Sequence, residues 1–232
     1  MDKVALRNFA VNAKEKMEND IKRKLELIGI TKKGIEKGEV EKTDYLKING
    51  HEFSEKEVNQ RKKLIEVLES RRNNKENDKE NFKKIFNELV EEIAYTWFNR
   101  IIAIRFMEVN DYIPDGIRIL SSDRENDREP QIIREVFDTD LEFSNDEKNN
   151  VYKLKEENKI EELFKFLFIK KCNKLNEILP ELFEEAEDYS ELLLPISIND
   201  EEGILRKLVD EVGEENFKIK NKNNENKNNG IG

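Results

Sequence analysis

The sequence predicts a mainly α-helical protein, an irregular helical bundle around one long central helix, with at most a small β-hairpin and a disordered C-terminal tail. Three observations carry this prediction. Apolar residues recur every three or four positions in several segments, which is the period of an amphipathic helix. One such segment, at residues 82–106, becomes apolar on nearly every side, so other elements must surround it. The last stretch, residues 216–232, is rich in Asn and Lys without an apolar period, which is typical of disorder.

The length and composition favour one domain with solvated appendages. The chain has 232 residues, enough to bury a sizeable core. Charged residues make up 41% and hydrophobic residues 36%, so apolar clusters must alternate with solvated stretches. We expect a helical N-terminal domain over residues 1–215, made of a basic helical segment with a loop at 1–75 and a helical core at 82–215, followed by the tail at 216–232.

The N-terminal third predicts two helices separated by a loop. The first helix covers residues 5–28 and ends at Gly29, the residue type that most often follows a helix. Short β-prone pieces follow, and Asn49-Gly50 is the signal of a tight turn in a small hairpin. Ser54 with Glu57 three residues later forms a capping box, which predicts a second helix extending to about residue 72. Residues 73–81 are a polar linker.

The remaining elements follow from periodicity and from the prolines. The long helix beginning at Phe82 ends at the turn 111–116, after which residues 117–120 form either a strand or a buried loop. Shorter helices are predicted after Pro130 and from about residue 159, and Pro180 bends or ends the second of these. Further on, the sequence predicts an apolar loop at 192–195 and a last amphipathic helix at 202–212.

The long helix carries charges where it is most apolar. Arg105 and Glu108 are three residues apart and can pair on one helix face, whereas Arg100 lies on a different face. A buried guanidinium needs a carboxylate or carbonyl partner, or else it faces a phosphate. We predict a structural role, with Glu108 holding Arg105 and an acid from a neighbouring helix holding Arg100. The predicted structural core comprises Trp97, Phe98, Arg100, Ile101, Arg105, Phe106 and Glu108.

The net charge of −10 is unevenly distributed. Residues 1–75 carry 19 basic and 14 acidic side chains, whereas residues 76–217 carry 19 and 37. Because neutralised phosphates supply non-specific affinity for nucleic acid, the basic segment is either a DNA contact or simply a solvated pair of helices. The candidate DNA-binding residues are Lys14, Lys16, Lys22, Arg23, Lys24, Arg61, Lys62 and Lys63.

The sequence contains too few cysteines and histidines for several common kinds of site. Cys172 is the single cysteine and His51 the single histidine, which leaves no material for a zinc site, a disulfide within the chain or a Cys/His catalytic pair. The sequence has no signal peptide and no apolar run as long as a membrane span, so we expect a cytoplasmic protein without a membrane partner.

Common catalytic motifs are also missing from the sequence. It contains no glycine-rich phosphate loop, no nucleophile elbow and no His-Glu-x-x-His motif. Paired carboxylates such as Glu91/Glu92 and Glu184/Glu185 are expected on solvated helix faces in a chain with 52 acidic residues. A Mg²⁺-dependent nuclease would need carboxylates around a lysine on a strand pair. Residues 39–42 with Asp44 are the candidate, and a solvated loop fits them better.

Three blocks of the sequence resemble a known family. They are KVALRNFAVNAKEKM at residues 3–17, AYTWFNRIIAIRFMEVNDYIPDGIRILSS at 94–122 and ELLLPISINDEEGILRKLVDEV at 191–212. In this order they resemble the amino-terminal region of the PglX-type adenine-specific DNA methyltransferases of BREX phage-exclusion systems, from residue 3 to about residue 215. The resemblance implies a helical domain that precedes a domain using S-adenosylmethionine to methylate adenine N6 in DNA.

Two departures limit what the resemblance implies. Such enzymes need a glycine-rich cofactor loop and an Asn-Pro-Pro-aromatic motif that holds the flipped adenine, but the four prolines of this chain are isolated. The family-like sequence also stops where a catalytic domain would follow. We therefore expect a truncated form, a frameshifted product or an isolated domain, with no catalytic, cofactor-binding or metal-binding residues. S-adenosylmethionine is expected as the cofactor of the full-length family and not of this chain.

The resulting functional expectation is a non-catalytic module of a site-specific DNA adenine methyltransferase of a phage-defence system. We expect it to brace the methyltransferase core and to contact DNA weakly, or to contact other phage-defence subunits. One alternative is a stand-alone helical subunit that binds a partner protein through its acidic face. A less favoured alternative is a Mg²⁺-dependent nuclease.

Overall fold

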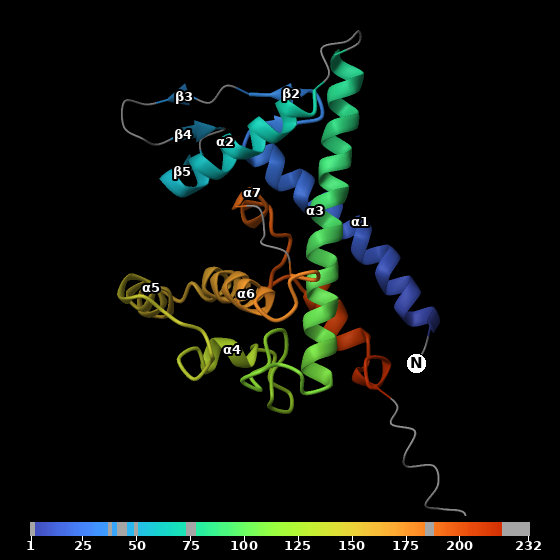
Figure 1. Ribbon diagram of the computed structural model, residues 1–232, viewed down its shortest axis with the longest axis vertical. Coiled ribbons are helices and arrows are strands. Elements are labelled where there is room, and N and C mark those ends of the chain that lie inside the picture. The colour runs from blue at the N-terminus through green and yellow to red at the C-terminus, as the bar shows by residue number, and fades with distance from the viewer. Residues whose placement is uncertain are drawn as a thin grey trace, which may run out of the picture.

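A computed structural model describes residues 3–36, 39–40, 46–48, 51–72, 78–183 and 188–219 of the chain. The described residues are mainly helical, as the sequence predicts (Figure 1). The helices of the first two thirds are α1 (Lys3–Leu27), α2 (Glu55–Ser70), α3 (Asp78–Val109), α4 (Gln131–Arg134) and α5 (Asn145–Glu156). The later helices are α6 (Ile160–Asn176), α7 (Asp188–Leu192), α8 (Ile204–Arg206), the π-helix η1 (Lys207–Glu211) and the 3₁₀ turn η2 (Glu214–Asn216).

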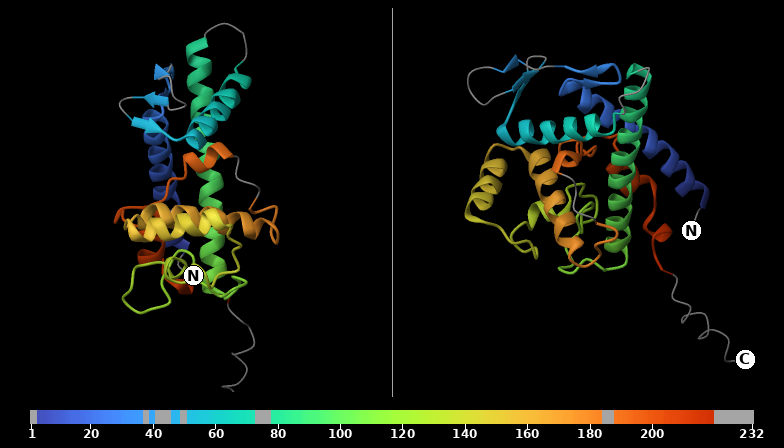
Figure 2. Two further views of the ribbon diagram at one scale, coloured as in Figure 1. Left: turned by 90° about the vertical axis from the view of Figure 1, so that its left-hand side faces the viewer. Right: turned by 45° about the horizontal axis from the view of Figure 1, so that its top comes forward.

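Helix α3 is the spine of the molecule. It is 32 residues long, and α1 packs across it over the middle of its length (Figure 1). Helix α6 lies transverse to α3, and α4 and α5 both pack against α6, with α5 on the side away from α3 (Figures 1 and 2). The helix begins at Asp78, four residues before the predicted start, while residues 73–77 of the predicted linker lie outside the described residues. The expected bundle around one long helix is confirmed.

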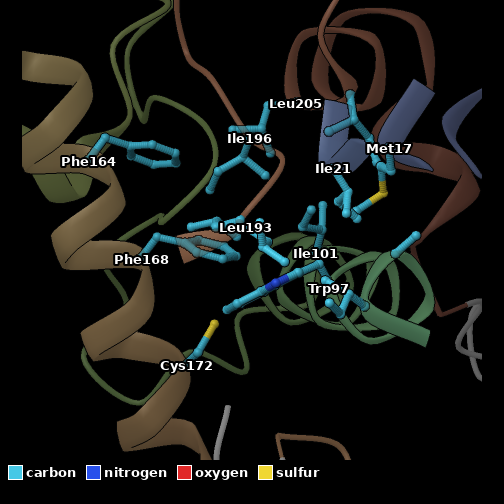
Figure 3. Packing of buried hydrophobic residues seen from close by; sticks show 14 of the residues in the cluster. Met17, Ile21, Trp97, Ile101, Phe164, Phe168, Cys172, Leu193, Ile196 and Leu205 are labelled. Carbon is cyan, nitrogen blue, oxygen red and sulfur yellow. The ribbon is translucent and has the colours of Figure 1, made fainter. Parts of the chain in front are cut away.

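The core forms where α1, α3, α6 and the C-terminal segment meet. Figure 3 shows side chains of these four parts pointing toward one another, and all of those labelled are buried. Their burial explains why residues on nearly every side of α3 are apolar, since α1 covers one side and α6 another. The labelled residues are Met17, Ile21, Trp97, Ile101, Phe164, Phe168, Cys172, Leu193, Ile196 and Leu205.

Two small antiparallel sheets lie between α1 and α2. Gly29 ends the first helix with a φ of +71°, a backbone conformation that glycine adopts without strain. The first sheet pairs β1 (Ile30–Thr31) with β2 (Gly34–Ile35), and the second has the order β3 (Glu39–Val40), β4 (Leu46–Ile48), β5 (His51–Phe53). Strands β4 and β5 form the predicted hairpin, with Ile48 opposite His51, and the turn residues 49–50 lie outside the described residues.

Capping boxes begin two of the helices. The Ser54 hydroxyl accepts a hydrogen bond from the N–H of Glu57, whose carboxylate accepts one from the N–H of Ser54, as predicted for α2. Ser144 and Glu147 form the same arrangement at the start of α5, a helix that the sequence analysis did not identify. Each box satisfies backbone donors that the first turn of a helix leaves without partners.

The segment directly after α3, residues 110–130, is a loop, and some later elements differ from those predicted. Residues 117–120 were predicted to form either a strand or a buried loop. They form a loop whose Ile117, Ile119 and Leu120 side chains are buried. The helix predicted at 202–212 is instead α8 continued by the π-helix η1. Helix α6 ends at Asn176, ahead of Pro180. Residues 220–232 of the predicted tail lie outside the described residues. A search of the described helices finds none with the length and apolarity needed to cross a bilayer.

Candidate functional site

A buried ion pair lies at the C-terminal end of α3. Nη1 of Arg105 is 3.2 Å from Oε2 of Glu108, and the two side chains are 2% and 0% exposed. The same nitrogen donates to the hydroxyl of Ser121 at 3.1 Å. The pair expected from the three-residue spacing is therefore present, and Arg105 is held by the protein instead of facing solvent.

Glu108 also holds the loop that follows α3. Its Oε1 accepts the backbone N–H groups of Ile119, at 2.5 Å, and Leu120. Burial raises the pKa of the Glu108 carboxyl, and the hydrogen bonds from Leu120, Arg105 and Ile119 oppose this rise. The carboxylate thus replaces backbone partners that loop 117–121 could not find in a sheet.

Glu214 connects this network to the last described segment of the chain, residues 213–219. Oε1 of Glu214 lies 2.7 Å from Nη1 of Arg118 and 3.4 Å from Nη2 of Arg105. Burial disfavours the ionised Glu214, but the two guanidinium groups outweigh it, and its pKa lies below the ordinary value. Asn110 adds a second tie, since its side-chain amide donates to the carbonyl of Phe217 at 2.9 Å. The C-terminal segment is thereby fastened to the end of α3.

A second buried ionic cluster joins α6 to the turn after α3. Nζ of the fully buried Lys171 lies 2.5 Å from Oδ2 of Asp115 and 2.5 Å from Oδ1 of Asp140. Burial disfavours an ionised Asp115, but hydrogen bonds from Lys171 and from the backbone N–H groups of Asp140 and Ile117 outweigh it. The pKa of Asp115 therefore lies below its ordinary value. The sequence analysis missed this cluster, although a lysine within the apolar run 163–172 was a usable signal.

Arg100 lies in the core beside an aromatic ring. Its guanidinium carbon is 4.8 Å from the ring centroid of Trp97, a cation–π contact. The indole N–H of Trp97 donates to the carbonyl of Ser190 at 3.1 Å, which ties α3 to α7. Burial raises the pKa of the nearby Cys172 thiol to about 12, so the thiol is not a nucleophile at neutral pH. The carboxylate expected to hold Arg100 stays a prediction.

The predicted core residues divide into two groups by burial. Trp97, Ile101 and the charged residues Arg100, Arg105 and Glu108 are buried, whereas Phe98 and Phe106 are partly buried and pack against the core. Each buried ion pair is made between groups of the protein, which fits a structural role, although Nε of Arg105 is left without a hydrogen-bond partner among the described residues. Within the described ranges, no three His, Cys, Asp or Glu side chains gather where they could hold a metal ion.

Four of the candidate DNA-binding residues on α1 pair with carboxylates. Lys14 lies 2.5 Å from Glu91 and Lys16 lies 2.9 Å from Asp200. Arg23 pairs with Asp20, and Lys22 lies 3.5 Å from Glu18. Because an acid neutralises each of them, these residues present less positive charge than the sequence count suggests.

The other four candidates differ in exposure. Arg61 is buried, and its guanidinium donates to the carbonyls of Ile28 and Glu36 at 2.7 Å each, so it fastens α2 to the turn after α1. It therefore does not lie on the basic surface expected of it. Lys24 is half-buried, and burial together with Lys165 lowers its pKa. Lys62 and Lys63 are exposed on α2.

The acidic candidates of the sequence analysis are placed only in part. Glu91 pairs with Lys14, and Glu92 accepts from Arg71 at 2.8 Å. Glu39 lies in strand β3. Residues 41–45, which include the rest of the nuclease candidate, and residues 184–187 lie outside the described residues.

An apolar groove runs between α1 and α3. It encloses about 550 Å³, and its lining combines apolar residues with charged and polar ones: Ala10, Ala94, Tyr95 and Phe98, together with Lys14, Glu88, Glu91, Glu92 and Asn99. Tyr95 is 68% exposed, which is high for a large ring in the middle of a spine helix. The ion pair of Lys14 with Glu91 borders the groove. We name this feature the α1–α3 groove, and its composition suits contact with another protein surface.

Comparison with known proteins places the chain beside two methyltransferases. It is 36% identical over 228 residues to the adenine-specific methyltransferase PglX of Lacticaseibacillus casei (strain Zhang), a match covering 94% of this chain and 18% of that protein. It is 36% identical over 129 residues to the adenine-specific methyltransferase BrxX of Escherichia coli O9:H4 (strain HS), covering 55% of this chain and 11% of that protein. No family model matches the chain.

The chain thus spans less than a fifth of the length of the curated relatives that it matches. The match to PglX includes nearly all of the chain, and so extends well beyond the three blocks that carried the resemblance in the sequence. The resemblance is confirmed: this chain is similar over almost its whole length to part of the adenine-specific methyltransferase PglX, and over about half of its length to part of the adenine-specific methyltransferase BrxX.

Proposed function

We propose that this chain is a non-catalytic module of a BREX-type adenine-specific DNA methyltransferase, and that it braces the catalytic part of that enzyme. One observation carries the proposal: 94% of the chain matches PglX, yet the sequence holds neither a glycine-rich cofactor loop nor an Asn-Pro-Pro-aromatic motif. The buried ionic groups of the described residues support it, because Arg105 pairs with Glu108, and Lys171 with Asp115 and Asp140, so that these charges join helices and loops.

The α1–α3 groove is the surface that we assign to the catalytic part. An exposed tyrosine amid alanine and phenylalanine on two long helices resembles the apolar centre of a protein interface. Helix α3 is held in place beside the groove, since its Trp97 and Ile101 side chains are fully buried in the core. A rigid surface binds with a small entropic cost, which suits a bracing role.

Complementation tests this proposal. PglX of Lacticaseibacillus casei is produced without the region that matches this chain, and N6 methylation of DNA adenine is measured with and without added chain. We expect the mixture to elute as one complex and to methylate more than the shortened enzyme alone. Tyr95→Glu should abolish both effects, while Tyr112→Glu, a matched exposed tyrosine outside the groove, should preserve them. Absence of complex and of stimulation would refute the bracing role.

DNA contact by this chain is a weaker part of the same proposal. Four cations of α1 are already paired, so we assign the contact to the exposed Lys62 of α2, and binding to duplex DNA should be weak and fall steeply with salt. Titration of a fluorescent duplex should show lower affinity for Lys62→Gln than for the matched control Lys32→Gln, which removes an exposed lysine elsewhere. Equal affinity of both variants would place the contact elsewhere.

The stand-alone interaction subunit is the second candidate function. The α1–α3 groove favours it equally, because an apolar groove does not reveal which polypeptide covers it. The complementation experiment separates the two, since a stand-alone subunit would leave the methylation rate of shortened PglX unchanged. A nuclease would instead cleave DNA with Mg²⁺.

A further inference from the structure

An aromatic cluster lies on the side of the molecule away from α1. Phe137, Phe143, Tyr152 and Phe166 follow one another in contact, with ring centroids 5.7 Å apart for Phe137 and Phe143, 5.2 Å for Phe137 and Tyr152, and 6.4 Å for Phe143 and Phe166. We name these four residues the aromatic platform. They come from the loops around α4, from α5 and from α6, and α5 is at the outer edge of the molecule in Figures 1 and 2.

The platform presents ring surface to solvent. Phe137 is 42% exposed and Tyr152 is 54% exposed, while Phe143 and Phe166 are partly buried beneath them. Large rings gain most when buried, so two neighbouring exposed rings are a costly surface for a protein to leave open. Their contact with two further rings keeps them in place, which makes the platform preorganised for binding.

One ring of the platform already accepts a cation from within the chain. Nζ of Lys170 lies 5.4 Å from the centroid of Phe143, and the same ammonium lies 2.7 Å from Glu147. An aromatic face together with a carboxylate is the combination that holds an ammonium or guanidinium group. The contact of Lys170 with Phe143 and Glu147 therefore shows, within this chain, how a cation can bind to the exposed rings beside it.

The chain around the platform is strongly acidic. Residues 135–147 contain six carboxylates and no Lys or Arg. Asp140 is held by Lys171, and Glu147 by Lys170. Asp138 and Glu142, each next in sequence to a platform ring, are exposed and form no ion pair with any described residue. Lys174 interacts electrostatically with Glu142, but no described cation lies within ion-pair distance of either carboxylate, so both place negative charge beside the exposed aromatic rings.

We propose that the aromatic platform is the docking site for a basic segment of a separate partner protein, with arginine or lysine side chains lying on Phe137 and Tyr152 and pairing with Asp138 and Glu142. Charge complementarity selects this occupant, because carboxylates attract cations and repel phosphates. Guanidinium groups suit the site best, since they stack on rings and pair with carboxylates at once. The inference does not depend on the methyltransferase proposal, as the platform is remote from the α1–α3 groove.

A peptide titration tests the inference. Fluorescein-labelled nona-arginine is titrated with the full chain, and anisotropy gives the Kd at low and at physiological salt. We expect Phe137→Leu/Tyr152→Leu, which keeps apolar bulk but removes both ring faces, to weaken binding by about fivefold or more. The matched control Tyr112→Leu removes an exposed ring that belongs neither to the platform nor to the α1–α3 groove, and it should bind as the native chain does.

The carboxylates have their own arm of the experiment. Asp138→Asn/Glu142→Gln should weaken binding and reduce its salt dependence, whereas Glu15→Gln/Glu66→Gln, a matched pair of exposed acids on α1 and α2, should not. Thermal unfolding of each variant checks that it is folded. The proposal is overturned if the native protein does not bind nona-arginine, or if Asp138→Asn/Glu142→Gln binds it as tightly as Glu15→Gln/Glu66→Gln does. It is also overturned if a single-stranded oligodeoxyadenylate displaces nona-arginine from the platform.

Discussion

At the scale of single residues, the buried charges of this protein join separate elements of the fold. Arg105 and Glu108 connect the end of α3 with the loop after it, and Lys171 connects α6 with Asp115 in the same region. Desolvating such groups is costly, and each is tolerable only because its partners are buried with it. Removing one member of a pair is therefore more damaging than removing both.

Substitution of Arg105 should reveal this dependence. Arg105→Leu leaves Glu108 buried without its cation and unable to reach water, so the free energy of unfolding should fall by roughly 3–5 kcal/mol. The double variant Arg105→Leu/Glu108→Gln removes the stranded charge and keeps an acceptor for Ile119, so it should recover part of the loss. Urea denaturation of both variants measures the effect. A double variant less stable than the single one would contradict the structural role.

Asp115 should make stability depend on acid pH. Because its pKa in the folded chain lies below the ordinary value of 3.8, ionised Asp115 stabilises the fold above that value. This contribution is lost as the pH falls from about 4 through the lower folded pKa. Asp115→Asn should thus be less stable at neutral pH and should lose less stability on acidification. Urea unfolding across this pH range checks it, with exposed Asp138→Asn expected to follow the native curve.

At the scale of elements, local signals and tertiary contacts decide different helices. The apolar periodicity of α1 and α3 is long enough to predict both, but α5 has only two buried residues, Val151 and Leu154, and so a weak period. The start of α5 could nevertheless have been predicted from Ser144 and Glu147, which form the same kind of capping box that predicted α2. The π-helix at 207–211 has no such local signal, because it depends on packing that the sequence does not display.

The capping box of α5 should contribute measurably to stability. Ser144→Ala removes the acceptor for the N–H of Glu147 and should lower the free energy of unfolding by about 1 kcal/mol. Ser144→Asp restores an acceptor and should be close to native. In Ser144→Ala, amide hydrogen exchange should become faster in α5, whereas exchange in α3 should stay as in the native chain. Equal exchange of Ser144→Ala and native α5 would show that contacts with α6 alone define the helix.

At the scale of the whole molecule, sequence reasoning predicted more of the architecture than of the sites. The spine helix and the Arg105–Glu108 pair follow from spacing within one element. Lys171, Asp115 and Asp140 come together from three separated segments, and no spacing rule links them. Arg61 was taken for surface charge because its two carbonyl partners, at residues 28 and 36, are set by the turn after α1. Tertiary partners of this kind are invisible to a single sequence.

Our central proposal is that the residues of this chain are structural and carry out no methyl transfer themselves. The most direct measurement incubates the purified chain with tritiated S-adenosylmethionine and adenine-rich duplex DNA and counts tritium in the DNA. The account predicts no transfer above a protein-free control and no change in the melting temperature of the chain on addition of the cofactor. Tritium on adenine N6 with this chain alone would contradict the account.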